Sequence, residues 1–290
     1  MAKNYRRRKR IKRITHKILV YTLIVVFSLA FLLPFFWMLS TSFKKYDEIF
    51  SIPISFIPKE WIWTNYADVF ESSEYVNILV GLRNTLIIVI PSTIIGTLTA
   101  ALAGFAFAKV PFKGRSPIFF ALISTMAIPG IITMIPTYIL FSKIGWVNTW
   151  FPLMIPGMFG GAGAIFFTRQ YMKTIPREIA EAARVDGLSW WGIFWRIYLP
   201  LSKPIIISNL LFGFIGGYND WLGPTLYLNT DANAKTLQQM IAMLNDTFGT
   251  RWGIQMAGSC LALIPTFIIF VVCQKFFIQG VNLNAGKDDA

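Results

Sequence analysis

Charged side chains are scarce in this chain of 290 residues. Aspartate, glutamate, lysine and arginine make up only 14% of the sequence, whereas hydrophobic residues make up 55%. A water-soluble domain would carry about 25% charged residues. Because this deficit leaves too little polar surface for a protein surrounded by water, the composition excludes an ordinary soluble domain. It predicts a polytopic membrane protein.

Histidine and cysteine are also nearly absent, which excludes most catalytic and metal sites. The single histidine, His16, lies in a basic N-terminal stretch, so the apolar part of the chain has no Ser–His pair and no histidine ligand for a metal. Cys260 and Cys273 fall in one apolar run, and their spacing matches neither a disulfide framework nor a metal site. A G-x-x-x-x-G-K-S/T phosphate loop is missing as well. The sequence therefore predicts no catalytic residue, no metal ligand and no cofactor-binding residue.

Long apolar runs are abundant instead. Six of them approach the ~20 residues that a helix needs to cross about 30 Å of hydrocarbon, so the sequence predicts an all-α fold with six transmembrane helices. The runs lie at about 18–39, 84–107, 117–141, 151–171, 205–228 and 254–277. Pro129 and Pro136 interrupt the third run, and two interpretations stay open: a simple kink, or a break that lines a pathway.

Positive charge is distributed unevenly among the segments between these runs. The net charge is +13, and 20 of the 27 lysine and arginine residues fall in the N-terminal tail, residues 109–115, residues 169–203 and the C-terminal end from Lys275 onward. Lysine and arginine concentrate in the cytoplasmic segments of membrane proteins, so this asymmetry predicts that both termini are cytoplasmic. Nucleic-acid binding by the basic residues of 1–17 is a much weaker alternative, and no nucleic-acid partner is expected.

The predicted topology divides the chain into five parts. Residues 1–17 form a basic cytoplasmic tail, and residues 18–39 form the first transmembrane helix. Residues 40–76 contain six carboxylates and three lysines, and form an extracytoplasmic loop that rests partly on the membrane interface. Residues 77–278 hold a core of five transmembrane helices and include a cytoplasmic loop at 176–200, and residues 279–290 form a second cytoplasmic tail.

A polar and aromatic interruption at 178–200 separates the fourth and fifth apolar runs. Its sequence is EIAEAARVDGLSWWGIFWRIYLP. The first part is rich in alanine and charge, and Gly187 ends it because glycine readily adopts a positive φ. Ser189 can cap a second helix, which Leu199 and Pro200 close because proline cannot continue the hydrogen-bond ladder. The pattern predicts two short helices joined by a sharp turn on the cytoplasmic side.

The best candidate for an ionisable residue within a span is Asp220, in the stretch GGYNDWLGP. Either Tyr218, Asn219 and Asp220 border a polar path for a solute, or Asp220 is simply a charge at the membrane edge. A carrier coupled to protons or sodium needs ionisable groups within its spans. One carboxylate without a basic partner gives such coupling little support. An external energy source is therefore predicted, with an ion-coupled secondary transporter as the alternative.

The interruption at 178–200 resembles the EAA loop of binding-protein-dependent ABC importer permeases. The residues that carry the match keep the spacing of that family: Glu181-Ala182-Ala183, three residues, Gly187, nine residues, Ile197, one residue and Leu199-Pro200. Further matches extend the resemblance over nearly the whole chain, and they are Asn84-Thr85, Met134-Ile135-Pro136, Gly145 and Ile175-Pro176. The proportions are similar to the carbohydrate branch, in particular to the second permease subunit of maltose transporters.

This resemblance implies a type I ABC importer permease fold and a set of partners. They are a second, homologous permease subunit, two cytoplasmic ATPase subunits that use ATP and Mg²⁺, and an extracytoplasmic solute-binding protein that faces the loop at 229–253. In that family the EAA loop forms coupling helices that dock in a groove of the ATPase. The implied docking residues are Glu181, Ala182, Ala183, Asp186, Gly187, Ile197, Leu199 and Pro200.

The implied function is import of a sugar or oligosaccharide through a bacterial cell membrane by alternating access. This chain would contribute no catalysis and bind no cofactor. A permease for another class of solute is an open alternative, whereas an interaction protein without transport would not explain five spans after the first. The aromatic residues of the loop either bury against the ATPase or brace the permease's own spans, and they are Trp190, Trp191, Phe194 and Trp195.

Overall fold

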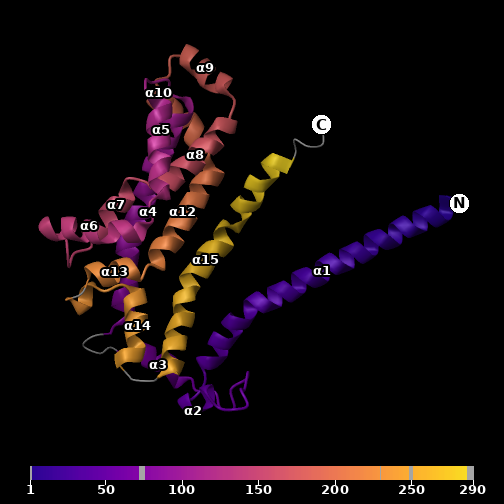
Figure 1. Cartoon of the computed structure of the whole chain (residues 1–290), viewed down its shortest axis with the longest axis vertical. Coiled ribbons are helices and arrows are strands. Elements are labelled where there is room, and N and C mark those ends of the chain that lie inside the picture. The colour runs from indigo at the N-terminus through magenta and orange to yellow at the C-terminus, as the bar shows by residue number, and fades with distance from the viewer. Residues whose placement is uncertain (1, 72–75, 229, 248–250, 286–290) are drawn as a thin grey trace. The chain divides into compact units, whose positions relative to one another are not determined.

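The computed structural model describes most of the chain, namely residues 2–71, 76–228, 230–247 and 251–285. All regular structure within these ranges is helical, which confirms the predicted all-α class for them (Figure 1). The chain divides into two compact units, Met1–Glu71 with Leu244–Leu261 and Ser72–Met243 with Ala262–Ala290.

Among the described residues, four helices are long and apolar enough to cross a membrane by themselves. They are Lys12–Thr41, Ile78–Lys109, Phe151–Thr174 and Trp252–Gln274. Two bent pairs of helices also qualify when each pair is taken as one span, and they are Arg115–Ala127 with Gly130–Lys143 and Trp190–Leu201 with Lys203–Tyr218. Counted in this way, the structure has the six predicted spans.

The smaller unit is built on α1 (Ala2–Thr41), the longest helix in the described part of the chain. Its most apolar 18 residues, within Lys12–Thr41, have a mean hydropathy of 2.6, and none of these is buried within the structure, whereas Ser40 and Thr41 at the end of the helix are buried. Two short helices follow, α2 (Tyr46–Ile49) and α3 (Thr64–Phe70), and α15 (Trp252–Ala285) begins in the same unit. The side chains of α1 are therefore available to lipid or to another subunit.

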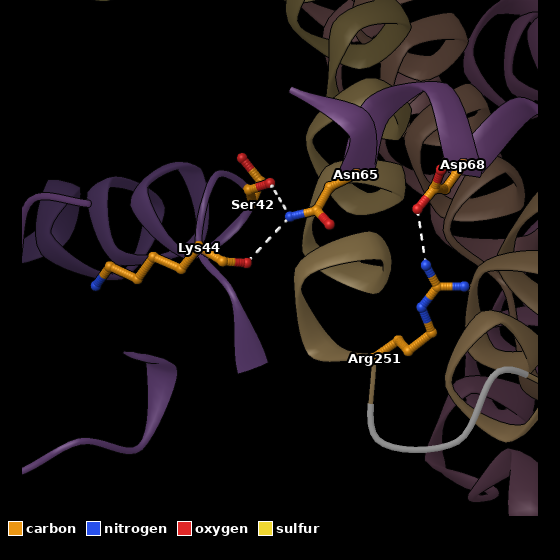
Figure 2. Close-up of polar contacts among 5 residues, drawn as sticks. All are labelled: Ser42, Lys44, Asn65, Asp68 and Arg251. Atoms are coloured by element: carbon orange, nitrogen blue, oxygen red, sulfur yellow. Dashed lines mark hydrogen bonds and ion pairs between the residues drawn. The ribbon is translucent and has the colours of Figure 1, made fainter. Parts of the chain in front are cut away.

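Figure 2 shows the polar contacts that hold α3 in the smaller unit. The side-chain amide of Asn65 donates hydrogen bonds to the carbonyl oxygens of Ser42, at 2.9 Å, and Lys44, at 3.1 Å. Arg251 forms an ion pair of 2.8 Å with Asp68, which connects α3 to the start of α15. Since the carbonyl groups around a helix end lack intrahelical partners, Asn65 satisfies two backbone groups just beyond α1.

The larger unit is organised around α4, which packs along three other helices (Figure 1). α4 spans Ile78–Lys109, and its neighbours are α7 (Phe151–Met158), α8 (Ala162–Thr174) and α12 (Lys203–Tyr218). One face of α4 is buried and the rest is exposed. This is the arrangement expected for a helix that is covered by other spans on one side and by lipid or a second subunit on the other.

Glycines allow the second and fourth spans to approach at backbone distance. Gly96 in α4 lies so near the carbonyl oxygen of Gly157 that a Cβ atom at position 96 would overlap it. Gly160, between α7 and α8, has a φ of +74°, and a Cβ there would lie 2.9 Å from the backbone nitrogen of Ala100. Small residues commonly serve this purpose in membrane helix packing.

The third span is broken at Pro129 but not at Pro136. α5 (Arg115–Ser124) and α6 (Gly130–Lys143) meet at 98°, with Pro129 immediately before α6. Pro136 lies inside α6, so the alternative of a break at this residue is wrong and that of a simple kink stays open. The physical reason is that an internal proline removes only one intrahelical hydrogen bond and can be accommodated within a continuous membrane helix.

The predicted span limits also need correction at three ends. Asn77 accepts a hydrogen bond of 3.1 Å from the backbone nitrogen of Val80 and so starts α4 ahead of the predicted residue 84. The fifth span stops at Tyr218, and a separate helix, α13 (Leu222–Tyr227), occupies the rest of its predicted range. The last helix continues to Ala285, beyond the predicted residue 277.

Parts of the predicted tails and loops lie outside the described residues. They are residue 1 of the N-terminal tail, residues 72–75 of the loop at 40–76, residues 229 and 248–250 of the loop at 229–253, and residues 286–290 of the C-terminal tail. The loop at 229–253 includes a 3-10 turn (Ala232–Ala234) and α14 (Leu237–Thr247). The assignment of tails and loops to the two sides of the membrane stays a prediction.

Candidate functional site

The predicted helix–turn–helix is present in the structure. α9 (Arg177–Val185) ends in a Schellman motif, in which Leu188 N donates to the carbonyl of Ala183 at 3.0 Å and Gly187 N donates to that of Arg184 at 3.1 Å. Gly187 has a φ of +84°, the left-handed conformation that this motif needs. A Cβ atom at Gly187 would meet nothing within 4 Å. The backbone conformation, and not a lack of space, therefore requires glycine here.

The second helix of the motif is capped as the sequence predicts. Ser189 precedes α10 (Trp190–Ile193), and its hydroxyl oxygen accepts a hydrogen bond of 3.2 Å from the backbone nitrogen of Gly192. This contact satisfies one of the backbone donors that a helix start leaves free.

The end of the motif lies later than predicted. A π-helical turn, Phe194–Tyr198, follows α10, and α11 (Leu199–Leu201) continues it before a bend of 78° into α12. The expectation that Leu199 and Pro200 close the helix is therefore wrong. Pro200 lies in the first turn of α11, where a residue without an N–H group is tolerated.

A buried apolar cluster fixes the base of the motif to the spans. Its members come from α4, α8 and the motif itself, and they are Ala101, Phe105, Met172, Ala180, Ala183, Ile193, Phe194 and Tyr198. The ring of Phe194 lies 5.5 Å from that of Phe105, and Trp190 lies 6.3 Å from the same ring. Trp191 and Trp195 are exposed, by 59% and 41%. The aromatic set is therefore divided: Phe194 and Trp190 brace the chain's own spans, and the other two tryptophans are open to lipid or a partner.

Two polar contacts hold the connection that leads into α9. The ammonium group of Lys109, at the end of α4, donates to the carbonyl of Ile175 at 2.5 Å and lies 5.5 Å from the centre of the Tyr198 ring. The hydroxyl of Tyr198 donates to the carbonyl of Pro176 at 3.4 Å. The start of α9 is thus held by the end of the second span, through Lys109, and by the later part of the motif, through Tyr198.

The predicted docking residues occupy two different environments. Five are exposed, namely Glu181, Ala182, Asp186, Gly187 and Pro200. Ala183 is buried in the apolar cluster, and Ile197 and Leu199 pack partly against it. The exposed surface is therefore concentrated on α9 and its turn, and the later anchors of the EAA pattern position that surface.

Val185 is a candidate contact residue that the sequence reasoning missed. It is the last residue of α9 and is 87% exposed. The buried residues of α9 are Ala180 and Ala183. Since successive helical residues are rotated by about 100°, Val185 falls on the side away from both. The available signal in the sequence was an apolar residue on the otherwise polar face of α9.

The second candidate site lies where the fifth span breaks, at Tyr218, Asn219 and Asp220. Tyr218 is buried, and its hydroxyl donates to the carbonyl of Ala262 in α15 at 3.0 Å. Asn219 is exposed. The carboxylate of Asp220 accepts a hydrogen bond of 3.1 Å from the backbone nitrogen of Gly223, at the start of α13. The structure therefore brings together Asn219 and Asp220 at the break, while Tyr218 points into the helix packing.

A cavity of about 240 Å³ adjoins this break and is lined by small and polar residues of α4, α7, α8 and α12. Ser92 and Thr97 of α4 line it, as does Asn209 of α12. The amide of Asn209 donates to the hydroxyl of Thr168 at 2.9 Å. A smaller cavity next to it is lined by Ser92 and Asp220. These polar residues were missed because they are uncharged and lie within long apolar runs, and only packing brings them to one wall.

Replacing Asp220 with alanine is expected to destabilise the protein by about 1 kcal/mol, because the start of α13 loses its side-chain acceptor. Asp220→Asn keeps an oxygen acceptor and is expected to retain nearly normal stability and uptake. Thermal unfolding of the purified protein and solute uptake in cells would be compared for both variants. Loss of uptake in both variants at unchanged stability would contradict the capping role and would show that the negative charge itself is needed.

Several apolar spans, with a polar helix–turn–helix between two of them, define a multi-pass membrane protein. The family model described as "Binding-protein-dependent transport system inner membrane component" matches residues 92–283. The chain belongs to this family. It is a membrane component of a binding-protein-dependent transport system, and its role is transport rather than catalysis.

Relatives match over nearly the whole chain. The lactose transport system permease protein LacG of Rhizobium radiobacter is 28% identical over 91% of this chain and 94% of its own. The arabinooligosaccharides transport system permease protein AraQ of Halalkalibacterium halodurans is 30% identical over 95% of this chain and 99% of its own. Among solved structures, a chain of a bacterial ABC transporter involved in the import of the acidic polysaccharide alginate matches with a TM-score of 0.77. The identity is 22%, and the match covers 90% of this chain and 95% of that one. The last match confirms the fold of an ABC importer permease.

Proposed function

We propose that this chain is one of the membrane-spanning subunits of an ATP-driven importer for a sugar or oligosaccharide. The substrate class is supported by two relatives that are named for lactose and arabinooligosaccharide transport. Each match covers more than 90% of this chain and of the relative. The chain would act in a bacterial cell membrane, with both termini cytoplasmic, and would alternate between states that open to the two sides.

The energy would come from a separate ATPase that docks on α9 and its turn. The exposed residues there include an acid, Glu181, and an apolar side chain, Val185, which together suit a groove with a basic residue and an apolar floor. The buried cluster beneath α9 and the contacts of Lys109 and Tyr198 make the motif a rigid attachment to the spans. ATP and Mg²⁺ would be bound by that ATPase, and this chain would contribute no cofactor site.

The remaining partners follow from surfaces that this chain leaves open. A second, homologous permease would complete the translocation path, and an extracytoplasmic solute-binding protein would approach the loops at 229–253 and 40–76. The polar cavity beside Ser92 and Asn209 would form this subunit's share of the path. In this proposal Asn219 and Asp220 lie near that path, and Tyr218 supports them from behind.

The proposal is tested by purifying the full chain from its native membranes in mild detergent and measuring uptake in cells. We expect an ATPase to accompany the chain, and uptake to require ATP and to be inhibited by one class of unlabelled sugar. A chain that is isolated alone and whose uptake follows a proton or sodium gradient would be an ion-coupled carrier, which contradicts the proposal. ATP-dependent uptake that no mono- or oligosaccharide inhibits would indicate another class of solute.

Val185→Asp is expected to weaken retention of the ATPase and to reduce uptake by about tenfold or more, since burial of an unpaired carboxylate costs several kcal/mol. The folded chain itself should be unaffected because Val185 is 87% exposed. Val185→Ala is the matched control, and it should cause a much smaller loss. Co-purification of the ATPase and uptake at equal membrane levels would be measured. Normal retention of the ATPase by Val185→Asp would show that the turn is not the docking surface.

A further inference from the structure

The loop between α2 and α3 carries an uncharged and unusually exposed apolar stretch. Its ten residues 49–58, IFSIPISFIP, contain no charged side chain. Ile52 is 94% exposed. Four further large apolar side chains in the stretch are half or more exposed, and they are Phe50, Ile54, Phe56 and Ile57. So much adjacent apolar surface marks an interaction site rather than an ordinary solvated loop.

This stretch is held against the end of α1. The hydroxyl of Ser40 donates to the carbonyl of Phe56 at 2.5 Å, and the ammonium group of Lys44 donates to the carbonyl of Ser55. The ring of Phe56 meets that of Trp37 edge to face, with 5.7 Å between the ring centres. All of these contacts lie within the smaller unit. The position of the apolar stretch along α1 is therefore fixed.

That position is level with the last turn of a membrane span. The span ends at Thr41, and Trp37 lies four residues before it. At 1.5 Å per residue, the Trp37–Phe56 contact lies about 6 Å inside the end of the helix. Tryptophan is enriched at this depth, where hydrocarbon meets the headgroups. If α1 crosses the membrane up to Thr41, the exposed apolar side chains beside Phe56 lie at the level of this boundary.

The backbone of the stretch is suited to this medium. Pro53 and Pro58 have no N–H group, and the carbonyls of Ser55 and Phe56 already accept hydrogen bonds from Lys44 and Ser40. Fewer backbone groups are left without a partner, which lowers the cost of placing irregular backbone next to hydrocarbon.

The charged residues that flank the stretch are bound among themselves. One carboxylate oxygen of Glu48 accepts hydrogen bonds from the Ser55 hydroxyl, at 3.0 Å, and from Lys59 N, at 2.8 Å. Lys45 and Glu60 form an exposed ion pair of 2.5 Å. The loop therefore has a polar end near its base and an apolar tip, the division expected of a segment that lies at a membrane surface.

We propose that residues 50–57 insert into the phospholipid interface of the leaflet in which α1 ends, and anchor the smaller unit to the bilayer. We assign lipid as the occupant because the stretch lies beside Trp37, level with the last turn of an apolar helix that is long enough to span a membrane. The proposal requires only that α1 crosses the membrane, so it is independent of the transported solute.

The test is the depth of a spin label at Ile52→Cys in a variant that also carries Cys260→Ser and Cys273→Ala. The complete transporter would be reconstituted in vesicles of phosphatidylethanolamine and phosphatidylglycerol, and collision rates with oxygen, which partitions into lipid, and with a water-soluble nickel chelate would be measured. Lys59→Cys, on the polar side of the same loop, is the matched control. We expect the ratio of oxygen to nickel collisions to be several-fold higher at residue 52 than at residue 59.

Equal ratios at the two positions would overturn the proposal, because both labels would then be in water. Low collision rates with both reagents at residue 52 would also overturn it, because a protein partner and not lipid would then cover the stretch. If Ile52→Cys does not fold, Ile57→Cys, exposed on the same stretch, is labelled in its place and the same ratio is expected.

Discussion

Replacing Gly187 with valine is expected to abolish most solute uptake while leaving the protein inserted in the membrane. The residue has a φ of +84°, and no atom lies within 4 Å of the position of a Cβ. The whole effect is therefore conformational: a β-branched residue in the left-handed region costs about 1–3 kcal/mol, so the turn between α9 and α10 would rearrange. Because α9 presents the surface proposed to receive the ATPase, we expect uptake to fall by at least about tenfold, the equivalent of about 1.4 kcal/mol of coupling free energy.

A series at this position separates conformation from size. Asparagine tolerates the left-handed region better than other non-glycine residues, so uptake should decrease in the order Gly187, Gly187→Asn, Gly187→Ala, Gly187→Val. Gly192→Ala is the matched control, since a Cβ there makes only ordinary contacts of 3.6 Å and the residue has no positive φ. Uptake would be measured at equal membrane levels of each variant. Normal uptake by Gly187→Val would contradict the role of the turn in energy coupling.

Replacing Gly96 with alanine is expected to destabilise the larger unit, because the added Cβ overlaps the carbonyl oxygen of Gly157. A backbone atom cannot move aside as a flexible side chain can, so α4 and α7 would have to separate. Overpacking of this kind costs about 1–3 kcal/mol, which is a large share of the stability of a domain. We expect a lower melting temperature for the detergent-solubilised protein and a smaller amount in the membrane.

The partner glycine supplies the control for this prediction. A Cβ at Gly157 would meet only the Ser92 side chain, at 3.5 Å, which is ordinary contact. Gly157→Ala, on the other side of the same interface, should therefore have a melting temperature close to that of the original chain. If both alanine variants melt at the original temperature, the close approach of α4 and α7 does not contribute to stability as argued.

The helix–turn–helix could be predicted from the sequence because its signals are local. Gly187 determines the turn through its backbone conformation and Ser189 determines the cap through its side-chain hydroxyl, and the structure shows both. The effect of Pro200 was predicted wrongly because it does not depend on a local signal alone. Whether a proline ends a helix or begins the next turn depends on the preceding turn, and here that turn is a π-helix.

The division of the aromatic residues could not be predicted in the same way. Trp190, Trp191, Phe194 and Trp195 are similar in the sequence, which left open whether each of them contacts a partner or braces the chain's own spans. Burial of Phe194 and Trp190 depends on Phe105, which is far away in the sequence and reaches them only because α4 ends beside the motif. The exposure of Val185 is likewise evident only once Ala180 and Ala183 are seen in the core.

The sequence by itself determined the membrane class, the number of spans and the turn at Gly187, because these depend on composition, on the length of apolar runs and on local backbone preference. The tertiary structure decided which residues of the motif face outwards and which polar residues share a cavity. It also fixed the apolar stretch at 50–57 against the last turn of α1. These outcomes depend on contacts between residues distant in the chain, where side-chain packing and backbone approach at glycines such as Gly96 decide what is buried.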